Sequence, residues 1–237
     1  MSTCQDFRFG RLALSLKQMY VAIEGVIGVG KTTLASLIAQ RLGAESLHEV
    51  VEDNPFLPMF YQDPIRYGFK VQVFFLLSRY KQLLPLSQPS LFAGGVVADY
   101  LFDKDAIFAA MNLSGAEWDL YNDLYSNLAP RIPTPDLTIY LRAPLSVIFE
   151  RIRRRGRVFE KQIDPEYLAR LGEFYERHFA TYPHPLWIID TQEFNFAERE
   201  ADRDWVVRHV HERLETKAAS SNARSKTLDA ASLNDPS

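Results

Sequence analysis

The strongest chemical pattern in the chain is a glycine-rich segment, Gly25-Val26-Ile27-Gly28-Val29-Gly30-Lys31-Thr32, which matches G-x-x-x-x-G-K-[ST] at every fixed position. Its glycines allow the backbone to aim several N–H groups at phosphate oxygens, and a helix starting near Lys31 adds the positive end of its dipole. The lysine would neutralise charge on the β- and γ-phosphates, and the Thr32 hydroxyl would ligate Mg²⁺. We therefore expect residues 25–33, Thr33 included, to bind ATP with Mg²⁺.

A carboxylate further along the chain could complete the metal site. Val96-Val97-Ala98-Asp99 reads as a hydrophobic strand that ends in an acidic residue, as in other proteins with a phosphate loop of this kind. We expect Asp99 to share the metal with Thr32. The chain has no Asn-Lys-x-Asp sequence, which disfavours a GTPase.

Five arginines crowd around Gly156: Arg151, Arg153, Arg154, Arg155 and Arg157. Guanidinium groups this close repel one another unless solvent or an anion screens them. Their planar donors match the charge that spreads over a transferring phosphoryl group, and the glycine would let the segment turn over a nucleotide. A solvated basic helix end would also explain the cluster. Together with the phosphate loop, the cluster favours an arginine-rich lid.

Alternating strand-like and helix-like segments must position these residues. We expect strands at residues 19–24, 46–51, 94–99, 137–141 and 186–190, and helices at 31–42, 55–61, 65–84, 102–112, 116–128, 144–154, 165–179 and 198–216. Buried apolar strands separated by helices predict an α/β fold with a five-stranded parallel sheet flanked by helices. Ligands of such folds bind at the carboxyl ends of the strands, where the motifs above fall.

The length of 237 residues suits one domain, which we place at residues 19–216. Residues 1–18 read as an N-terminal extension or a start-site artefact, because Met19 stands directly before the strand-like run that begins at Tyr20. Residues 217–237 are rich in Ser, Ala, Asn and Asp and could not bury enough apolar surface to offset their ordering entropy. We therefore expect a disordered tail.

Composition narrows the partners and the compartment. The formal net charge of −3 argues against a general nucleic-acid binder. No run of 18 or more apolar residues is present, so we expect no membrane span. Cys4 is the single cysteine, which excludes an intrachain disulfide and fits a cytoplasmic protein.

Taken in order, the motifs resemble the deoxynucleoside kinase family, in particular its bacterial deoxyadenosine and deoxyguanosine kinase branch, which is similar to deoxycytidine kinase. The resemblance runs from about Met19 to Trp205. The matching segments are Ile23 to Thr33, Glu49 to Leu57, Phe60 to Pro64, Phe69 to Gln72, Leu77 to Arg79 and the lid Arg151 to Glu160, which fits R-x-x-x-R-G-R-x-x-E. The resemblance implies a homodimer that transfers the γ-phosphate of ATP to the 5′-hydroxyl of a deoxynucleoside, in nucleotide salvage.

The resemblance also implies roles for individual residues. Glu49 would be the general base, although Glu52 and Asp53 are rival carboxylates that the sequence leaves open. Catalytic residues beside Glu49 would be Lys31, Arg151, Arg155 and Arg157, which bind phosphate. Substrate-binding residues would be Glu49, Tyr61 and Glu160 for the sugar, Gln72, Arg79 and Phe108 for the base, and Asp99. A structural amide at Gln72 and simple core packing of Phe108 are the plainer alternatives.

One position departs from the family pattern. Tyr100 follows Asp99 where the family has an arginine, so Lys104 or a lid arginine would have to compensate. The same segment leaves Asp103 and Asp105 as alternatives for a base-reading aspartate. The segment Asp53-Asn54-Pro55-Phe56-Leu57 favours the purine branch, with deoxyadenosine or deoxyguanosine as substrate.

Two other functions remain open at this stage. A nucleoside monophosphate kinase, similar to thymidylate kinase, would use a phosphate as acceptor and would gain nothing from a general base. A nucleotide-binding subunit without catalysis would explain Tyr100 and would bind ATP without transferring phosphate.

Overall fold

The computed structural model describes residues 19–88, 94–157, 160 and 163–232, with side chains up to residue 219. The expectation for residues 1–18 lies outside this range. The strands are β1 (Tyr20–Gly25), β2 (Glu45–Leu47), β3 (Val96–Ala98), β4 (Leu137–Arg142) and β5 (Leu186–Asp190). The helices are α1 (Lys31–Leu42), α2 (Leu57–Phe60), α3 (Pro64–Leu83), α4 (Lys104–Asn112), α5 (Gly115–Leu128), α6 (Leu145–Arg155), α7 (Pro165–Ala180) and α8 (Glu200–Ser232).

The strands form one five-stranded sheet, as the sequence predicts. Their order is β2-β3-β1-β4-β5, which the sequence does not give. Every neighbouring pair is parallel, with Val21 opposite Leu137 and Tyr20 opposite Val96. Because all strands run the same way, the loops that follow them meet at one edge of the sheet. This edge brings the phosphate loop after β1 close to the loops after β2 and β3.

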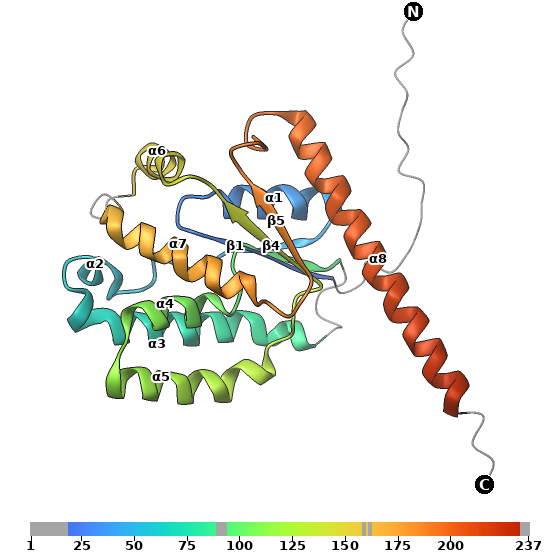
Figure 1. Ribbon diagram of the computed structural model, residues 1–237, viewed down its shortest axis with the longest axis horizontal. Coiled ribbons are helices and arrows are strands. Elements are labelled where there is room, and N and C mark those ends of the chain that lie inside the picture. The colour runs from blue at the N-terminus through green and yellow to red at the C-terminus, as the bar shows by residue number, and fades with distance from the viewer. Residues whose placement is uncertain (1–18, 89–93, 158–159, 161–162, 233–237) are drawn as a thin grey trace, which may run out of the picture.

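Both faces of the sheet are covered by helices (Figure 1). Val21 and Ile23 of β1 belong to a core with α1 and α8, whereas Tyr20 and Ala22 belong to a core with α3, α4, α5 and α7. Successive side chains of a strand point to opposite faces, so this alternation follows from the pleat. All residues of β1 are buried, and Glu24 is the one charged residue among them, as expected of a parallel strand covered on both faces.

The segment after β2 is less regular than the sequence predicts. β2 ends at Leu47 instead of Val51, and α2 covers residues 57–60 instead of 55–61. The N–H of Glu49 donates to Asp99 Oδ1 (2.8 Å) instead of a strand, and the N–H of Phe56 donates to Asn54 Oδ1 (3.0 Å). Side-chain acceptors thus replace strand and helix hydrogen bonds here.

The last helix continues past residue 216, where the sequence predicts a disordered tail. The backbone of α8 is helical to Ser232, and its C-terminal part extends away from the sheet (Figure 1). Leu214 is buried and Lys217 Nζ is 2.7 Å from Asp136 Oδ1. Residues 218–232 include five alanines, one arginine and one lysine, which favour helix.

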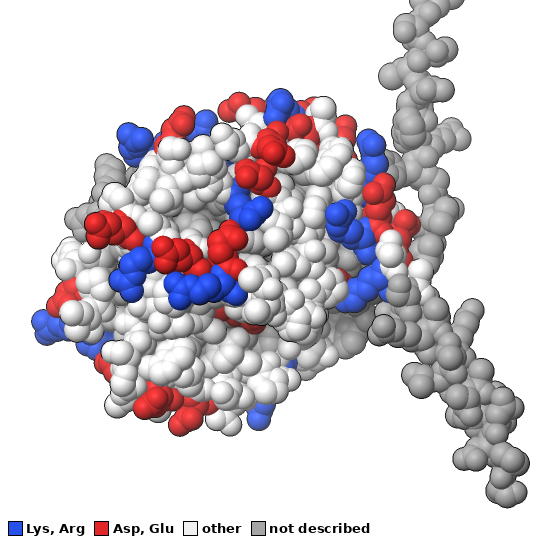
Figure 2. Space-filling view, in the orientation of Figure 1, with Lys and Arg blue, Asp and Glu red and all other residues white. Residues whose placement is uncertain are grey.

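Charges of both signs are intermixed on the face seen in Figure 2, most clearly along α7. Arg177 pairs with Glu173 on this helix, and Arg142 of β4 pairs with Glu176. Within the described residues, no helix is long and apolar enough to cross a membrane.

Candidate active site

A cavity of about 730 Å³ opens at the carboxyl edge of the sheet. Its walls come from the phosphate loop, the loop after β2, helices α3, α4 and α6, and the loop after β5. The predicted site residues that line it are Ile27, Gly28, Val29, Gly30, Lys31, Thr32, Thr33, Glu49, Tyr61, Gln72, Arg79, Asp99, Phe108, Arg151, Arg155, Arg157 and Glu160. Gly25 and Val26, which start the loop, are buried. The structure therefore brings nearly all of the predicted residues together.

The phosphate loop is tightly packed at its first residue. Gly25 has φ +150°, and a Cβ at this position would lie 2.5 Å from the carbonyl oxygen of Leu141 on β4. A side chain would therefore push the loop away from the sheet. Lys31 folds back over the loop and donates through Nζ to the carbonyl oxygens of Gly25 (2.6 Å) and Val26 (3.2 Å). Burial lowers the pKa of Lys31 to about 8, and the nearby ammonium of Lys104 adds to the effect.

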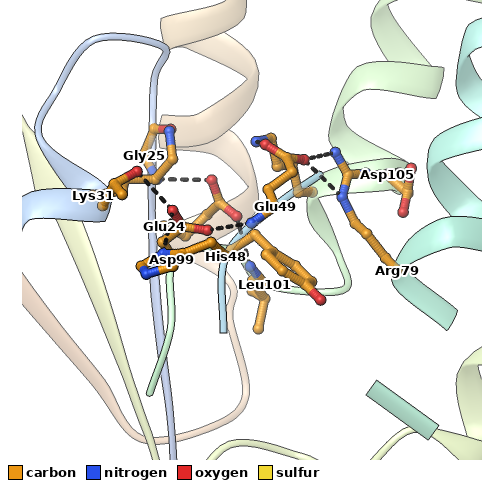
Figure 3. Close-up of polar contacts among 12 residues, drawn as sticks. Glu24, Gly25, Lys31, His48, Glu49, Arg79, Asp99, Leu101 and Asp105 are labelled. Carbon is orange, nitrogen blue, oxygen red and sulfur yellow. Dashed lines mark hydrogen bonds and ion pairs between the residues drawn. The ribbon is translucent and has the colours of Figure 1, made fainter. Parts of the chain in front are cut away.

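Glu24 holds the base of the phosphate loop, a role that the sequence reasoning did not assign. Its fully buried carboxylate accepts hydrogen bonds from Gly25 N (2.9 Å), Tyr175 Oη (2.8 Å) and Leu101 N (2.7 Å). The side chain thus joins the end of β1 to helix α7 and to the loop after β3 (Figure 3). A buried carboxylate needs such donors, because leaving it unpaired would cost several kcal/mol.

Asp99 and Thr32 lie together, as expected for a shared metal. Thr32 Oγ1 donates to Asp99 Oδ2 (2.6 Å), and His48 Nδ1 lies 3.2 Å from the same oxygen. Within the described residues no group of three or more His, Cys, Asp and Glu side chains could hold a metal. The pair nonetheless fits Mg²⁺, which commonly takes one or two protein oxygens and completes its shell with phosphates and water.

Glu49 is held between two cations. Arg79 donates to Glu49 Oε1 through Nε (2.9 Å) and also through its terminal nitrogen, and Lys104 Nζ donates to Oε2 (2.6 Å). Burial alone would raise the pKa of Glu49, but Lys104 and Arg79 hold it well below its usual range. The side chain is therefore an ionised carboxylate at neutral pH, the form that a general base requires.

The rival carboxylates, Glu52 and Asp53, do not line the cavity. Glu52 is exposed and pairs with Arg157 (2.7 Å), and Asp53 is exposed. Glu49, by contrast, lines the cavity. Geometry therefore favours Glu49 among the three acidic residues.

The two aspartates that the sequence left open are separated by the start of α4. Asp105 is fully buried and forms an ion pair with Arg79 (Figure 3), whereas Asp103 lies near Tyr125 Oη (3.3 Å) and His178 Nε2 (3.4 Å). Burial raises the pKa of Asp105 to about 6, although Arg79 opposes the shift. Asp105 is thus the aspartate that reaches the cluster beside the cavity.

The arginines of the predicted lid contact protein acceptors. Arg151 donates to Val29 O (2.9 Å) and Thr191 Oγ1 (2.8 Å), which ties the phosphate loop to the loop after β5. Arg155 Nε donates to Glu160 Oε2 (3.0 Å), and Arg157 lies 3.6 Å from the same carboxylate. A bound phosphate would compete with these protein acceptors for the hydrogen bonds that the arginines donate.

Tyr100 does not reach the cavity. It is fully buried, and its hydroxyl donates to Gln82 Oε1 on α3 (2.8 Å). Lys104 lines the cavity instead and supplies a cation beside Glu49. Both compensations that the sequence suggests, Lys104 and the lid arginines, line the cavity, and Lys104 is the one that contacts Glu49.

A stretch of the wall that sequence reasoning missed comes from the loop after β5. Residues 194–198 face the same cavity as Arg151 and the phosphate loop. The rule that ligands bind beyond the carboxyl ends of parallel strands could have identified this loop, because β5 is such a strand.

Comparisons with known proteins identify the family of the chain. Residues 21–215 match the sequence model of the family described as Deoxynucleoside kinase. The chain is 38% identical over 199 residues to the deoxyguanosine kinase of Bacillus subtilis (strain 168), covering 81% of this chain and 96% of the relative. It is 32% identical over 209 residues to the deoxyadenosine kinase of Lactobacillus acidophilus, covering 82% of this chain and 95% of the relative.

A solved structure shares the fold. The deoxyadenosine kinase from M. mycoides with bound dCMP and dCDP superposes with a TM-score of 0.72 at 29% identity. The match covers 82% of this chain and all of that one. From the phosphate loop to α8, the chain belongs to the deoxynucleoside kinase family.

Proposed function

We propose that this deoxynucleoside kinase transfers the γ-phosphate of ATP to the 5′-hydroxyl of a purine deoxynucleoside, deoxyguanosine or deoxyadenosine, in nucleotide salvage. The observation that carries the proposal is a continuous set of contacts across the cavity. Thr32 of the phosphate loop contacts Asp99, and Asp99 accepts from the N–H of Glu49. Donor phosphates at the loop and an alcohol at Glu49 would therefore meet in one cavity.

The chain's own groups would supply most of the catalysis by position and charge. Glu49 would accept the proton of the 5′-hydroxyl as the oxygen attacks phosphorus. Lys31 and the lid arginines Arg151, Arg155 and Arg157 would neutralise charge on the transferring group. Thr32 and Asp99 would hold Mg²⁺, which would supply positive charge next to the phosphates.

The acceptor would lie between α2, α3 and α4. Tyr61 and Glu160 would hold the 3′-hydroxyl, and Gln72, buried in α3 but facing the cavity, would pair with the base. Apolar side chains that would enclose the base are Leu57, Phe60, Val71, Phe75 and Phe108. Arg79 and Asp105 would complete the polar edge.

The preference for a purine rests on the relatives. Several of them carry the names deoxyguanosine kinase or deoxyadenosine kinase, and one is named deoxyadenosine/deoxycytidine kinase. A glutamine amide has one donor edge and one acceptor edge, so it can pair with adenine or with guanine. We therefore leave the choice between the two purines to experiment.

The state of Glu49 speaks against the other functions. A monophosphate kinase needs no general base, whereas Glu49 is positioned and ionised in the cavity. A subunit without catalysis would also bind ATP through Lys31, Thr32 and Asp99, but it would have no use for an ionised carboxylate at Glu49 in the same cavity.

A substrate panel tests the proposal. ADP release would be measured with deoxyguanosine, deoxyadenosine, deoxycytidine and thymidine, and with their monophosphates, under saturating ATP and Mg²⁺. We expect the highest kcat/KM with a purine deoxynucleoside and no transfer to monophosphates. A preferred monophosphate would overturn the nucleoside acceptor, and a preferred pyrimidine would overturn only the choice of base.

Two further proposals follow from the family. Exposed leucines on the neighbouring helices α3 and α5, Leu77 and Leu120, support a homodimer through these helices. Sedimentation velocity would show the dimer, or a monomer that contradicts it. We also propose a cytoplasmic location, which fractionation of the source cells would test.

A further inference from the structure

Lys104 is an ammonium group buried next to the proposed general base. It is the first residue of α4, its side chain is 6% exposed, and its Nζ lies 2.6 Å from Glu49 Oε2. The residue also lines the cavity, so the ammonium borders the space between Glu49 and the phosphate loop. Phe108, on the same face one turn later, has its ring centroid 5.8 Å from Nζ.

The two cations on Glu49 differ in how firmly they are held. Arg79 contacts Glu49 on one side and Asp105 on the other, and its planar fork fixes both contacts at once. Lys104 contacts the other oxygen of Glu49 through a single ammonium on a flexible stem. Glu49 can therefore release Lys104 by a side-chain rotation, whereas releasing Arg79 would disrupt a buried pair.

The general base must free one oxygen before it can act. Glu49 Oε1 already accepts from Arg79 Nε and its terminal nitrogen, and Oε2 accepts from Lys104. A substrate hydroxyl that donates to Glu49 would compete most easily with Lys104. The ammonium displaced in this way stays inside a cavity whose other wall is the phosphate loop.

Charge favours a second position for Lys104. The ammonium of Lys104 lies near enough to Lys31 to help lower the pKa of the latter. Two ammonium groups beside one cavity repel each other until an anion lies between them. A transferring phosphoryl group is such an anion, with charge spread over its oxygens.

We propose that Lys104 holds Glu49 in place while the site is empty and moves onto the transferring phosphoryl group when the nucleoside hydroxyl takes its place at Glu49. The inference rests on the proposed role of Glu49. In the step itself the 5′-oxygen forms its bond to the γ-phosphorus, and its proton passes to Glu49. The bond from phosphorus to the β-γ bridging oxygen breaks, and ADP leaves with that electron pair. Lys104 keeps its proton throughout and serves as a hydrogen-bond donor.

The test compares Lys104→Met with Lys104→Arg and with the control Lys70→Met. Lys70 is exposed on α3 and contacts the ring of Tyr67, outside the cavity. Three quantities separate a catalytic from a structural role: kcat, the Kd values of ADP and deoxynucleoside, and the Kd of the complex of ADP, Mg²⁺, aluminium fluoride and deoxynucleoside. That complex mimics the transferring phosphoryl group, which the ground-state ligands do not.

For Lys104→Met we expect kcat to fall by about 10²–10³-fold, as for the loss of one donor to a transition state. The affinity for the aluminium fluoride complex should fall by a similar factor, because only interactions that strengthen in the transition state change kcat. The affinities for ADP and for the nucleoside alone should stay within about threefold of wild type. Lys104→Arg should recover part of both losses, and Lys70→Met should match wild type.

Unchanged affinity of Lys104→Met for the aluminium fluoride complex would overturn the proposal, whatever happens to kcat. Lys104→Met could instead lose nucleoside and ADP binding and also lose its fold, as seen by circular dichroism. If Lys104→Gln behaved in the same way, Lys104 would have a structural role and the proposal would fail. Failure of the Glu49 role itself would appear separately, as near-normal turnover of Glu49→Gln.

Discussion

Two carboxylates on either side of Arg79, Glu49 at the cavity wall and the fully buried Asp105, illustrate how position decides chemistry at the scale of single residues. Glu49 faces both Lys104 and Arg79, and its pKa lies well below the usual range. Asp105 is completely enclosed, and burial outweighs Arg79 so that its pKa rises to about 6. The same guanidinium thus contacts one carboxylate that ionises readily and one that resists ionisation.

The raised pKa of Asp105 predicts a pH dependence of stability. A carboxyl whose pKa is higher in the folded state stabilises the fold in its protonated form, and this contribution is lost as pH rises from its unfolded value through about 6. Asp105→Asn keeps a neutral side chain at every pH. We expect wild type to lose unfolding free energy relative to this variant between about pH 4 and pH 7.

Urea unfolding of both proteins at a series of pH values in this window measures the difference. A constant offset between them would reflect the altered contact with Arg79 and does not affect the expectation. If wild type instead gained stability relative to Asp105→Asn as pH rose, Arg79 would dominate and the account of this pair would be wrong.

How well the sequence predicts single residues depends on whether their spacing is rigid. Lys31 and Thr32 belong to a contiguous motif, so their positions follow directly from the pattern. Glu49 was separated from Glu52 only by resemblance, and geometry was needed to support it. Asp103 and Asp105 flank the first residue of α4. Because each residue turns a helix by about 100°, the exact start of the helix decides which of the two faces the cluster.

At the scale of secondary-structure elements, Glu24 connects three segments that must stay in register. Its carboxylate accepts from the N–H groups of Gly25 and Leu101 and from the hydroxyl of Tyr175 on α7. One buried carboxylate therefore fixes three segments together: the phosphate loop, the loop after β3 and helix α7. Asp99, which precedes this loop, gains its position in part from the same contact.

Tyr175→Phe is expected to lower the unfolding free energy by about 1.5–3 kcal/mol, the usual range for a hydrogen bond to a charged group. Tyr140→Phe is a matched control, because Tyr140 is equally buried and donates to Glu176 (3.0 Å), whose side chain is 53% exposed. Water can replace that donor, so the control should lose less than about 1 kcal/mol. Equal losses in chemical denaturation would show that the contact with Glu24 has no special weight.

Elements with strong periodicity were predicted well. The bounds of α1 and β5 agree with the sequence analysis. Those of α3 differ by one residue at each end, and α7 differs by one residue at its C-terminal end. β2 was predicted too long, because Val50 and Val51 favour a strand by their residue type. In the structure the side chain of Asp99 instead accepts the N–H of Glu49. Such a long-range acceptor leaves no local signal.

At the scale of the whole molecule, the parallel sheet brings distant parts of the chain to one edge. The donor half of the cavity comes from residues 27–33 and 151–157, and the acceptor half from residues 49–79 and 99–108. The order of strands could not be read from the sequence, although the parallel direction and the binding edge could. The extent of α8 was also missed, because composition alone does not separate a solvated helix from a tail without structure.

The central claim is that a carboxylate after β2 activates an alcohol which faces phosphates held after β1. The turnover of Glu49→Gln, measured beside Glu52→Gln with the best deoxynucleoside from the panel, tests this claim most directly. We predict that Glu49→Gln lowers kcat by about 10²–10⁴-fold with the affinity for ATP retained, the range for loss of a general base. The kcat of Glu52→Gln should stay within about threefold of wild type, because the Glu52 side chain is exposed, pairs with Arg157 and contacts no reacting atom. Near-normal turnover of Glu49→Gln, or an equal loss in both variants, would contradict the account.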